Sequence, residues 1–157
     1  MDLGSTSKGL FHRAVYCGLH YRNNLGLLYA MRHEYEKAAE QFVSALIDGP
    51  PVGVQGEWQD NLAEAYLETG KNDLACQAWQ RAADLPRSKP DMTTVLGTAI
   101  CSLVTGQPQQ AAVRFCAAQE LAQEQNVNLL EIKTYEGWYA GPNQIIAAKK
   151  LIKQAER

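Results

Sequence analysis

Residues 24–46 read NLGLLYAMRHEYEKAAEQFVSAL, and residues 61–83 read NLAEAYLETGKNDLACQAWQRAA. When the two stretches are aligned, their small and apolar residues coincide at a constant spacing of 37 residues. The matching pairs are Leu25 with Leu62, Tyr29 with Tyr66, Ala38 with Ala75, Phe42 with Trp79, and Ala45 with Ala82. A period of 20–50 residues is typical of repeat proteins, in which each repeat is one supersecondary unit.

Two further copies follow the first two. The third lies 36 residues after the second, with Gly106, Ala111, Phe115 and Ala118 in the places of Gly70, Ala75, Trp79 and Ala82. A weaker fourth copy follows 37 residues later, at Tyr139, Ala148, Ile152 and Ala155. Spacings of 3, 4 and 7 place such residues on one helical face, where alanines allow two helices to approach and the bulky residue fills the space between them.

The pattern predicts four antiparallel helix pairs. Gly70 and Gly106 lie where the first helix of a pair ends, because glycine readily adopts the backbone conformation of such a turn. Prolines, which interrupt helices, separate the pairs at residues 50–51 and 86–90. The expected helices cover 20–32 with 35–48, 57–69 with 72–85, 92–105 with 108–124, and 128–139 with 143–156.

In these residues the chain resembles the tetratricopeptide repeat (TPR) family, whose unit is about 34 residues long. The first copy has the family's residues at the family's offsets, namely Leu25-Gly26, Tyr29, Ala38, Phe42, Ala45 and Pro50. The resemblance implies an all-α superhelix of three to four helix–turn–helix repeats, at about 19–52, 56–89, 92–125 and 129–157, after a partly packed N-terminal extension at 1–18. A helical bundle without a groove is the alternative, but a bundle would not need matched residues at a fixed period.

The composition excludes several classes of function. Among 157 residues, 15 Lys and Arg face 17 Asp and Glu, which gives a net charge of −2 and no basic excess for binding nucleic acid. No apolar run approaches the roughly 20 residues that span a bilayer, and no secretory signal precedes the repeats. No catalytic, phosphate-binding or metal-binding motif occurs, so we expect neither enzymatic activity nor a cofactor or metal.

The four cysteines, Cys17, Cys76, Cys101 and Cys116, each lie in an apolar helical pattern and form no C-x-x-C pair. We therefore expect buried, reduced thiols, with Cys76 and Cys116 the slowest to react, and a cytoplasmic location.

The TPR resemblance also implies a binding groove, lined by the first helix of each pair. Glu57, Asp60, Glu64 and Glu68 fall on one face of the second copy, and Leu96, Ile100 and Leu103 form an apolar stripe in the third. A solvated acidic face and a packed apolar core are the competing interpretations of these two stripes. The expected groove residues are Asn23, Leu27, Glu57, Asp60, Asn61, Glu64, Leu96, Ile100 and Leu103.

The predicted function is that of a protein- or peptide-binding scaffold or adaptor, with a basic and partly apolar partner. TPR domains that clamp the C-terminal carboxylates of chaperones use cations in the first and third repeats, and only Asn61 matches their set here, so we do not expect that ligand. The alternative function is a self-associating assembly subunit, for example a homodimer that covers exposed repeat edges.

Overall fold

A computed structural model describes residues 20–51, 53–86, 91–126, 146, 147, 149–151 and 153, and within these the chain forms helices and turns without a strand. The arrangement is an all-α helical repeat. Its helices are the segment 20–31, α2 (Tyr35–Asp48), α3 (Gln55–Glu68), α4 (Asn72–Asp84), α5 (Met92–Val104) and α6 (Pro108–Glu124). Each of these bounds lies within two residues of the bound predicted from the repeat.

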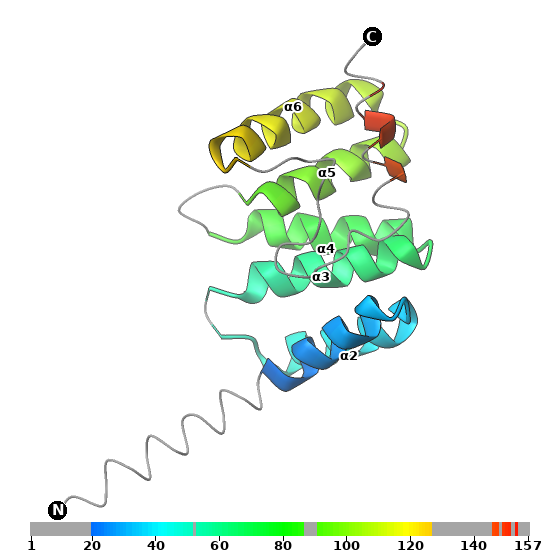
Figure 1. The fold of residues 1–157 in the computed structure, drawn as a ribbon, viewed down its shortest axis with the longest axis vertical. Helices are drawn as coiled ribbons and strands as arrows, with labels where there is room; N and C mark the ends of the chain where they lie inside the picture. The colour runs from blue at the N-terminus through cyan, green and yellow to red at the C-terminus, as the bar shows by residue number, and fades with distance from the viewer. Residues whose placement is uncertain are drawn as a thin grey trace, which may run out of the picture.

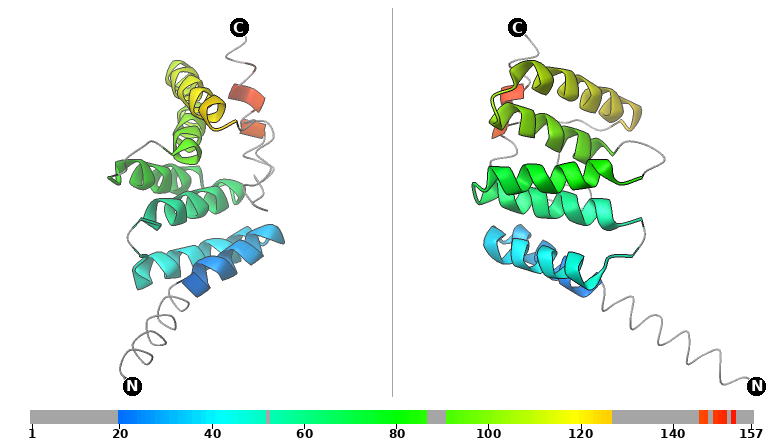
Figure 2. Two further views of the ribbon diagram at one scale, coloured as in Figure 1. Left: turned by 60° about the vertical axis from the view of Figure 1, so that its left-hand side comes forward. Right: turned by 180° about the vertical axis from the view of Figure 1, so that it is seen from behind.

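Successive helices lie side by side in one stack, from the blue segment 20–31 to the yellow α6 (Figure 1). α2 packs on α3, α3 on α4, α4 on α5 and α5 on α6, and α3 also contacts α5. The same order is seen from behind and from the side (Figure 2). The first helices of consecutive pairs therefore lie next to each other, which decides how much of the predicted groove is accessible.

The same tight turn joins the two helices of every described pair. In each turn one backbone N–H reaches back five residues: Glu34 to Tyr29 at 2.9 Å, Lys71 to Tyr66 at 2.9 Å, and Gln107 to Ser102 at 2.8 Å. The residue before each donor adopts a left-handed backbone, with φ of 60° at His33, 74° at Gly70 and 75° at Gly106. The predicted glycine turns are confirmed, and the first pair makes the same turn with a histidine.

The core consists of the residues that repeat in the sequence. Both alanine series are fully buried in the three described pairs, together with the bulky residue between them; these are Ala38, Phe42, Ala45, Ala75, Trp79, Ala82, Ala111, Phe115 and Ala118. Ala147 and Leu151, from the predicted fourth copy, belong to the same core cluster. The remainder of the fourth copy and the predicted extension at 1–18 lie outside the described residues.

Two glycines allow the aromatic rings to approach the first helices closely. A Cβ added at Gly26 would lie 2.6 Å from the ring of Phe42, which belongs to the same pair. A Cβ added at Gly97 would lie 2.3 Å from the ring of Trp79, which belongs to the preceding pair. Phe42 therefore packs within a repeat, whereas Trp79 also joins one repeat to the next.

The N-termini of both helices of the third pair have residues that suit a helix start. The Asp91 carboxylate accepts hydrogen bonds from the backbone N–H groups of Thr93 and Thr94, at 2.9 and 3.2 Å, and so caps α5. Pro108 begins α6, where its missing N–H removes no helical hydrogen bond.

Candidate functional site

Three polar residues of the predicted groove hold neighbouring first helices together. Asn61 of α3 donates to the Asn23 side chain of segment 20–31 at 3.2 Å. The Thr94 hydroxyl of α5 lies 3.0 and 2.8 Å from the two carboxylate oxygens of Asp60. Asn23, Asp60, Asn61 and Thr94 are all buried, so these bonds form away from bulk water. The expectation that Asn23, Asp60 and Asn61 line an accessible groove therefore needs correction, because all three side chains are buried.

The apolar stripe of the third pair belongs mainly to the core. Leu96 and Ile100 are among the most deeply buried large side chains of the chain, and Leu103 is half-buried against the same cluster. Core packing, the competing interpretation of this stripe, is what the structure shows for Leu96 and Ile100. Only Leu103 keeps part of its side chain accessible.

What remains accessible on the first helices is a smaller and more acidic surface. Glu57 is exposed, and Leu27, Glu64 and Leu103 are half-buried. Glu68, one turn beyond Glu64 on α3, is half-buried as well. The four predicted acids thus do not share one environment, because Asp60 is inside while the other three reach the surface. We call Leu27, Glu57, Glu64, Glu68 and Leu103 the first-helix surface.

The pKa of Tyr35, at the start of α2, is affected by the negative charge of this surface. Burial raises the pKa of the Tyr35 phenol, and the nearby carboxylates of Glu68 and Glu64 raise it further. The phenol oxygen lies 2.8 Å from Nδ1 of His33 in the preceding turn. Sequence analysis did not identify Tyr35, since its neighbours on α3 are about 30 residues away in the chain.

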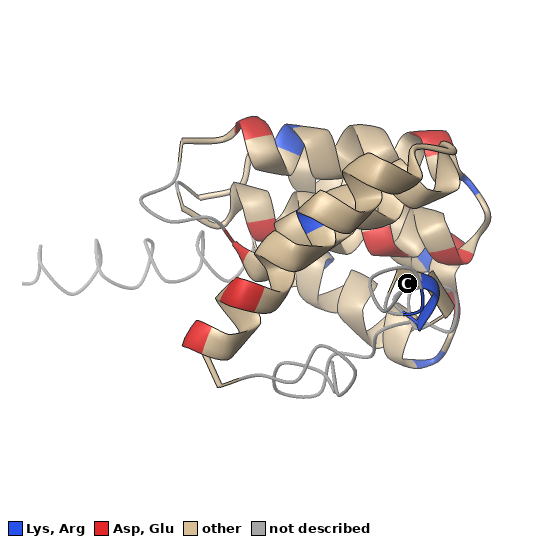
Figure 3. Cartoon of the chain, turned by 90° about the horizontal axis from the view of Figure 1, so that it is seen from above, with Lys and Arg blue, Asp and Glu red and all other residues tan. Residues whose placement is uncertain are grey.

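A compact charge cluster lies in the same turn. Glu34 pairs with Arg32, at 2.9 Å, and with Lys37. The hydrogen bond from Lys37, together with the charges of Arg32 and Lys37, lowers the pKa of the Glu34 carboxyl. More widely, acidic and basic residues are interspersed along the described helices (Figure 3). Within the described ranges, no group of three or more His, Cys, Asp or Glu side chains is arranged to hold a metal ion.

No family model matches the chain. The curated proteins contain no match to it either. The function is therefore inferred from the repeat geometry and from the surfaces described above.

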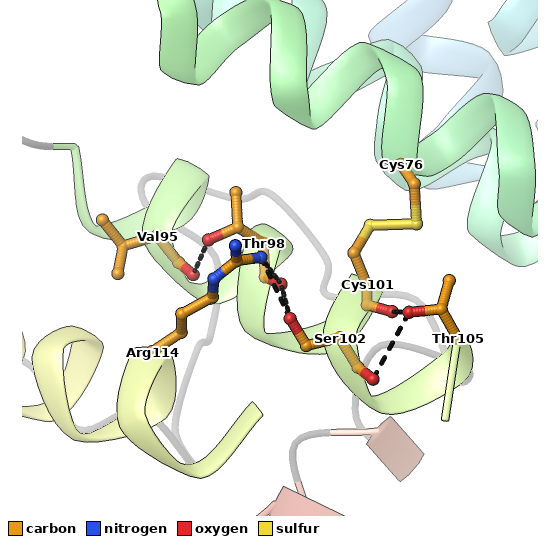
Figure 4. Close-up of a disulfide and its surroundings, with 7 residues drawn as sticks. All are labelled: Cys76, Val95, Thr98, Cys101, Ser102, Thr105 and Arg114. Atoms are coloured by element: carbon orange, nitrogen blue, oxygen red, sulfur yellow. Dashed lines mark hydrogen bonds between the residues drawn. A yellow bond between two sulfur atoms is a disulfide. The ribbon is translucent and has the colours of Figure 1, made fainter. Parts of the chain in front are cut away.

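The cysteines differ from the sequence prediction. Cys76 of α4 and Cys101 of α5 form a disulfide, with their Cα atoms 5.5 Å apart (Figure 4). Cys116 is a free and exposed thiol. The expectation of reduced thiols is thus wrong for Cys76 and Cys101, and the expected slow reaction of Cys116 conflicts with its exposure. Cys17 lies outside the described residues.

The repeat alignment contained the signal that could have revealed the disulfide. Cys76 and Cys101 occupy the positions of Ala39 and Ala65 one repeat earlier, and both alanines are buried. These positions face the junction between consecutive pairs, where two small side chains come together. The helical pattern around each cysteine gives no sign of the other, because the two lie on different helices, 25 residues apart.

The third pair is also joined internally by a basic side chain. The Arg114 guanidinium of α6 donates to the Thr98 carbonyl at 3.2 Å and to the Ser102 hydroxyl at 3.0 Å (Figure 4). Both acceptors lie on α5, so this contact fixes the two helices of the pair beside the disulfide junction.

Within the described residues, no helix combines the length and the apolar character that crossing a bilayer requires.

Proposed function

We propose that this chain is a TPR-type scaffold that binds a segment of another protein, rather than an enzyme. The observation that carries the proposal is the stack of equivalent helix pairs, in which the first helices are neighbours: α3 contacts α5, and Asn61 of α3 bonds to Asn23 of segment 20–31. Stacked repeats form extended surfaces of this kind, on which a partner can contact several repeats at once. The first-helix surface draws its residues from all three described pairs.

The charge of the first-helix surface indicates the chemistry of the partner. Glu57, Glu64 and Glu68 all lie on α3, and the pKa of Tyr35 rises partly because of Glu68 and Glu64. Negative potential steers and selects cationic side chains. Leu27 and Leu103, on the neighbouring first helices, offer partly accessible apolar contact. The ligand that fits best is a basic segment with apolar residues at its ends.

A cytoplasmic location remains a prediction. Reduced thiols would favour that location, and the Cys76–Cys101 disulfide removes this support. Disulfides persist mainly in oxidising compartments, although transient and redox-sensing ones also occur in the cytosol.

Charge reversal on α3 tests the proposed surface. The probe is a fluorescent peptide with a central run of lysines flanked by leucines, and its binding is followed by anisotropy at low and high salt. We expect Glu57→Lys with Glu64→Lys to weaken binding by about tenfold or more at low salt and to reduce its salt dependence. Asp60 is unsuitable for reversal, because a lysine there would disrupt the buried contact with Thr94.

The matched control is Glu120→Lys with Glu124→Lys, which makes the same change of charge on exposed positions of α6. If both double variants weaken binding equally, only the net charge matters and the surface is not a specific site. A peptide with glutamates in place of the lysines should not bind. Unchanged affinity of the α3 variant at both salt concentrations would refute the proposal.

A further inference from the structure

The described residues near the C-terminus are helical, but they do not extend the stack of repeats. Residues 146, 147, 149–151 and 153 have helical conformation, and we call them the C-terminal segment. In all three views this red segment lies beside α5 and α6, at the level of these two helices (Figures 1 and 2). A fourth repeat would instead be stacked beyond α6.

The burial pattern of the C-terminal segment also differs from that of a second helix. In the repeat alignment Ala147 falls at the position of Lys37, Leu74 and Gln110 in the three described pairs. All three counterparts are exposed, whereas Ala147 is 6% exposed. Leu151, one turn later, is fully buried. The segment therefore packs through a face that the second helices leave in solvent.

The buried face of the segment belongs to the same core as the last first helix. Ala147 and Leu151 join the hydrophobic cluster that includes Ile100 of α5. Ile100 is completely buried, whereas its counterparts on the two earlier first helices, Leu27 and Glu64, are half-buried. Among the three described first helices, this position is thus closed only on α5, at whose level the segment lies.

The segment lies on the side of the stack to which the first helices belong. In the left view of Figure 2, α3 is displaced from α4 toward one side, and the red segment lies on that same side of α5 and α6. Its lysines, Lys149, Lys150 and Lys153, are exposed. The segment thus combines an apolar face with basic residues, which is the chemistry assigned above to the partner.

We propose that the C-terminal segment is an internal competitor of that partner, docked at the α5 end of the first helices through Ala147 and Leu151. This inference rests on the proposed function, because it assigns the same surface to an external basic segment. The carboxylates of α3 favour lysines from either source, and the apolar side chains of α5 can pack against only one of the two at a time. The partner therefore binds only after the C-terminal segment has undocked.

The docked contact is small enough to be reversible. Among the described residues of the segment, only Ala147 and Leu151 are buried, and Ile146 beside them is 52% exposed. Because the segment belongs to the same chain, its effective concentration is high and it redocks when the surface is vacated. The apparent affinity for a partner falls in proportion to the fraction of undocked molecules, so docking in about 90% of them weakens binding about tenfold.

Undocking the segment by mutation tests the competition. Leu151→Glu places a carboxylate at a fully buried position, which disfavours docking. We expect it to tighten binding of the lysine–leucine probe by about tenfold or more, measured by anisotropy. The matched control is Ile146→Glu, which adds the same charge to the exposed side of the same segment and should leave the affinity nearly unchanged. Equal tightening in both variants would overturn the proposal.

A second measurement adds the segment as a separate molecule. A labelled peptide with the sequence of residues 143–157 should bind the Leu151→Glu chain, and it should bind the wild-type chain at least about tenfold more weakly, because the wild-type surface is already occupied. The same peptide carrying Leu151→Glu should bind neither chain. This test does not use the lysine–leucine probe, so its outcome is independent of the proposed function.

Two results would overturn the proposal in different ways. If Leu151→Glu binds the peptide but not the probe more tightly, the segment docks reversibly without competing, and the proposed function is then judged by the charge reversal on α3 alone. If Leu151→Glu lowers stability and the peptide does not bind, the segment is a fixed part of the core. Should Leu151→Glu fail to fold by circular dichroism, Leu151→Ala provides the same comparison with a smaller expected effect.

Discussion

At the scale of single residues, the turn inside each repeat shows how closely the three described pairs follow one design. The left-handed conformation is easy for Gly70 and Gly106, which have no Cβ. At His33 the same conformation brings Cβ close to a carbonyl oxygen, which costs about 1–2 kcal/mol in a residue other than glycine. The first turn is therefore held in place by the helices on either side of it.

We expect His33→Gly to stabilise the fold. Relief of the strained backbone should outweigh the extra conformational freedom of an unfolded glycine, which costs about 0.5–1 kcal/mol. The net gain should be up to about 1 kcal/mol in the free energy of unfolding, measured by urea denaturation. Gly70→Ala is the converse test and should lose about 1–2 kcal/mol. A loss of stability in His33→Gly would mean that the contact between His33 and Tyr35 matters more than the backbone.

At the scale of helices, the junction between α4 and α5 carries a covalent bond where the junction between α2 and α3 has two alanines. Ala39 and Ala65 are buried at the first junction, and the second has a covalent bond between Cys76 and Cys101 at the equivalent positions. Both junctions tolerate small side chains there, so alanine is a conservative replacement for the disulfide.

We expect Cys76→Ala with Cys101→Ala to lower the free energy of unfolding by about 3 kcal/mol, because the cross-link closes a loop of this length in the unfolded chain. The cross-linked residues are 25 apart. Adding a reductant to the wild-type chain should lower its stability by a similar amount, whereas Cys116→Ala should change little. Alkylation in denaturant without reductant should modify two of the four cysteines. Modification of all four would contradict the disulfide.

The helices were predictable from the sequence because each repeat contains its own signals for helix, turn and close packing. Trp79 and the alanine series indicated the core, and Gly70 and Gly106 indicated the turns. The accessibility of the groove was not predictable in this way. The family offsets state which side of a first helix faces the concave surface, but not how closely neighbouring first helices approach. That distance depends on contacts between repeats, such as Asp60 with Thr94, whose partners are 34 residues apart.

At the scale of the whole molecule, we expect the stability of each helix pair to depend on its contacts with the neighbouring pairs. Repeat proteins lack contacts between distant parts of the chain, so every junction contributes to holding the stack together. Trp79 is central to this arrangement, since it is fully buried and its ring lies against Gly97 of the following pair.

We therefore expect Trp79→Ala to lower the free energy of unfolding by about 3–5 kcal/mol, as large-to-small changes in packed cores do. Hydrogen exchange should show the loss of protection extending from α4 into α5, because the cavity opens the contact with Gly97. Val113→Ala, at an exposed site on α6, should alter stability by no more than about 0.5 kcal/mol. A melting temperature of Trp79→Ala within a degree or two of the wild type would refute this role.

The disulfide also limits how far the chain can be extended by force. If the two ends are pulled apart, the segment between Cys76 and Cys101 cannot lengthen, because its ends remain bonded with Cα atoms 5.5 Å apart. A fully extended segment of this length would measure about 80 Å. Single-molecule stretching should therefore give a contour length that is shorter by about that amount under oxidising conditions, and the missing length should return on reduction.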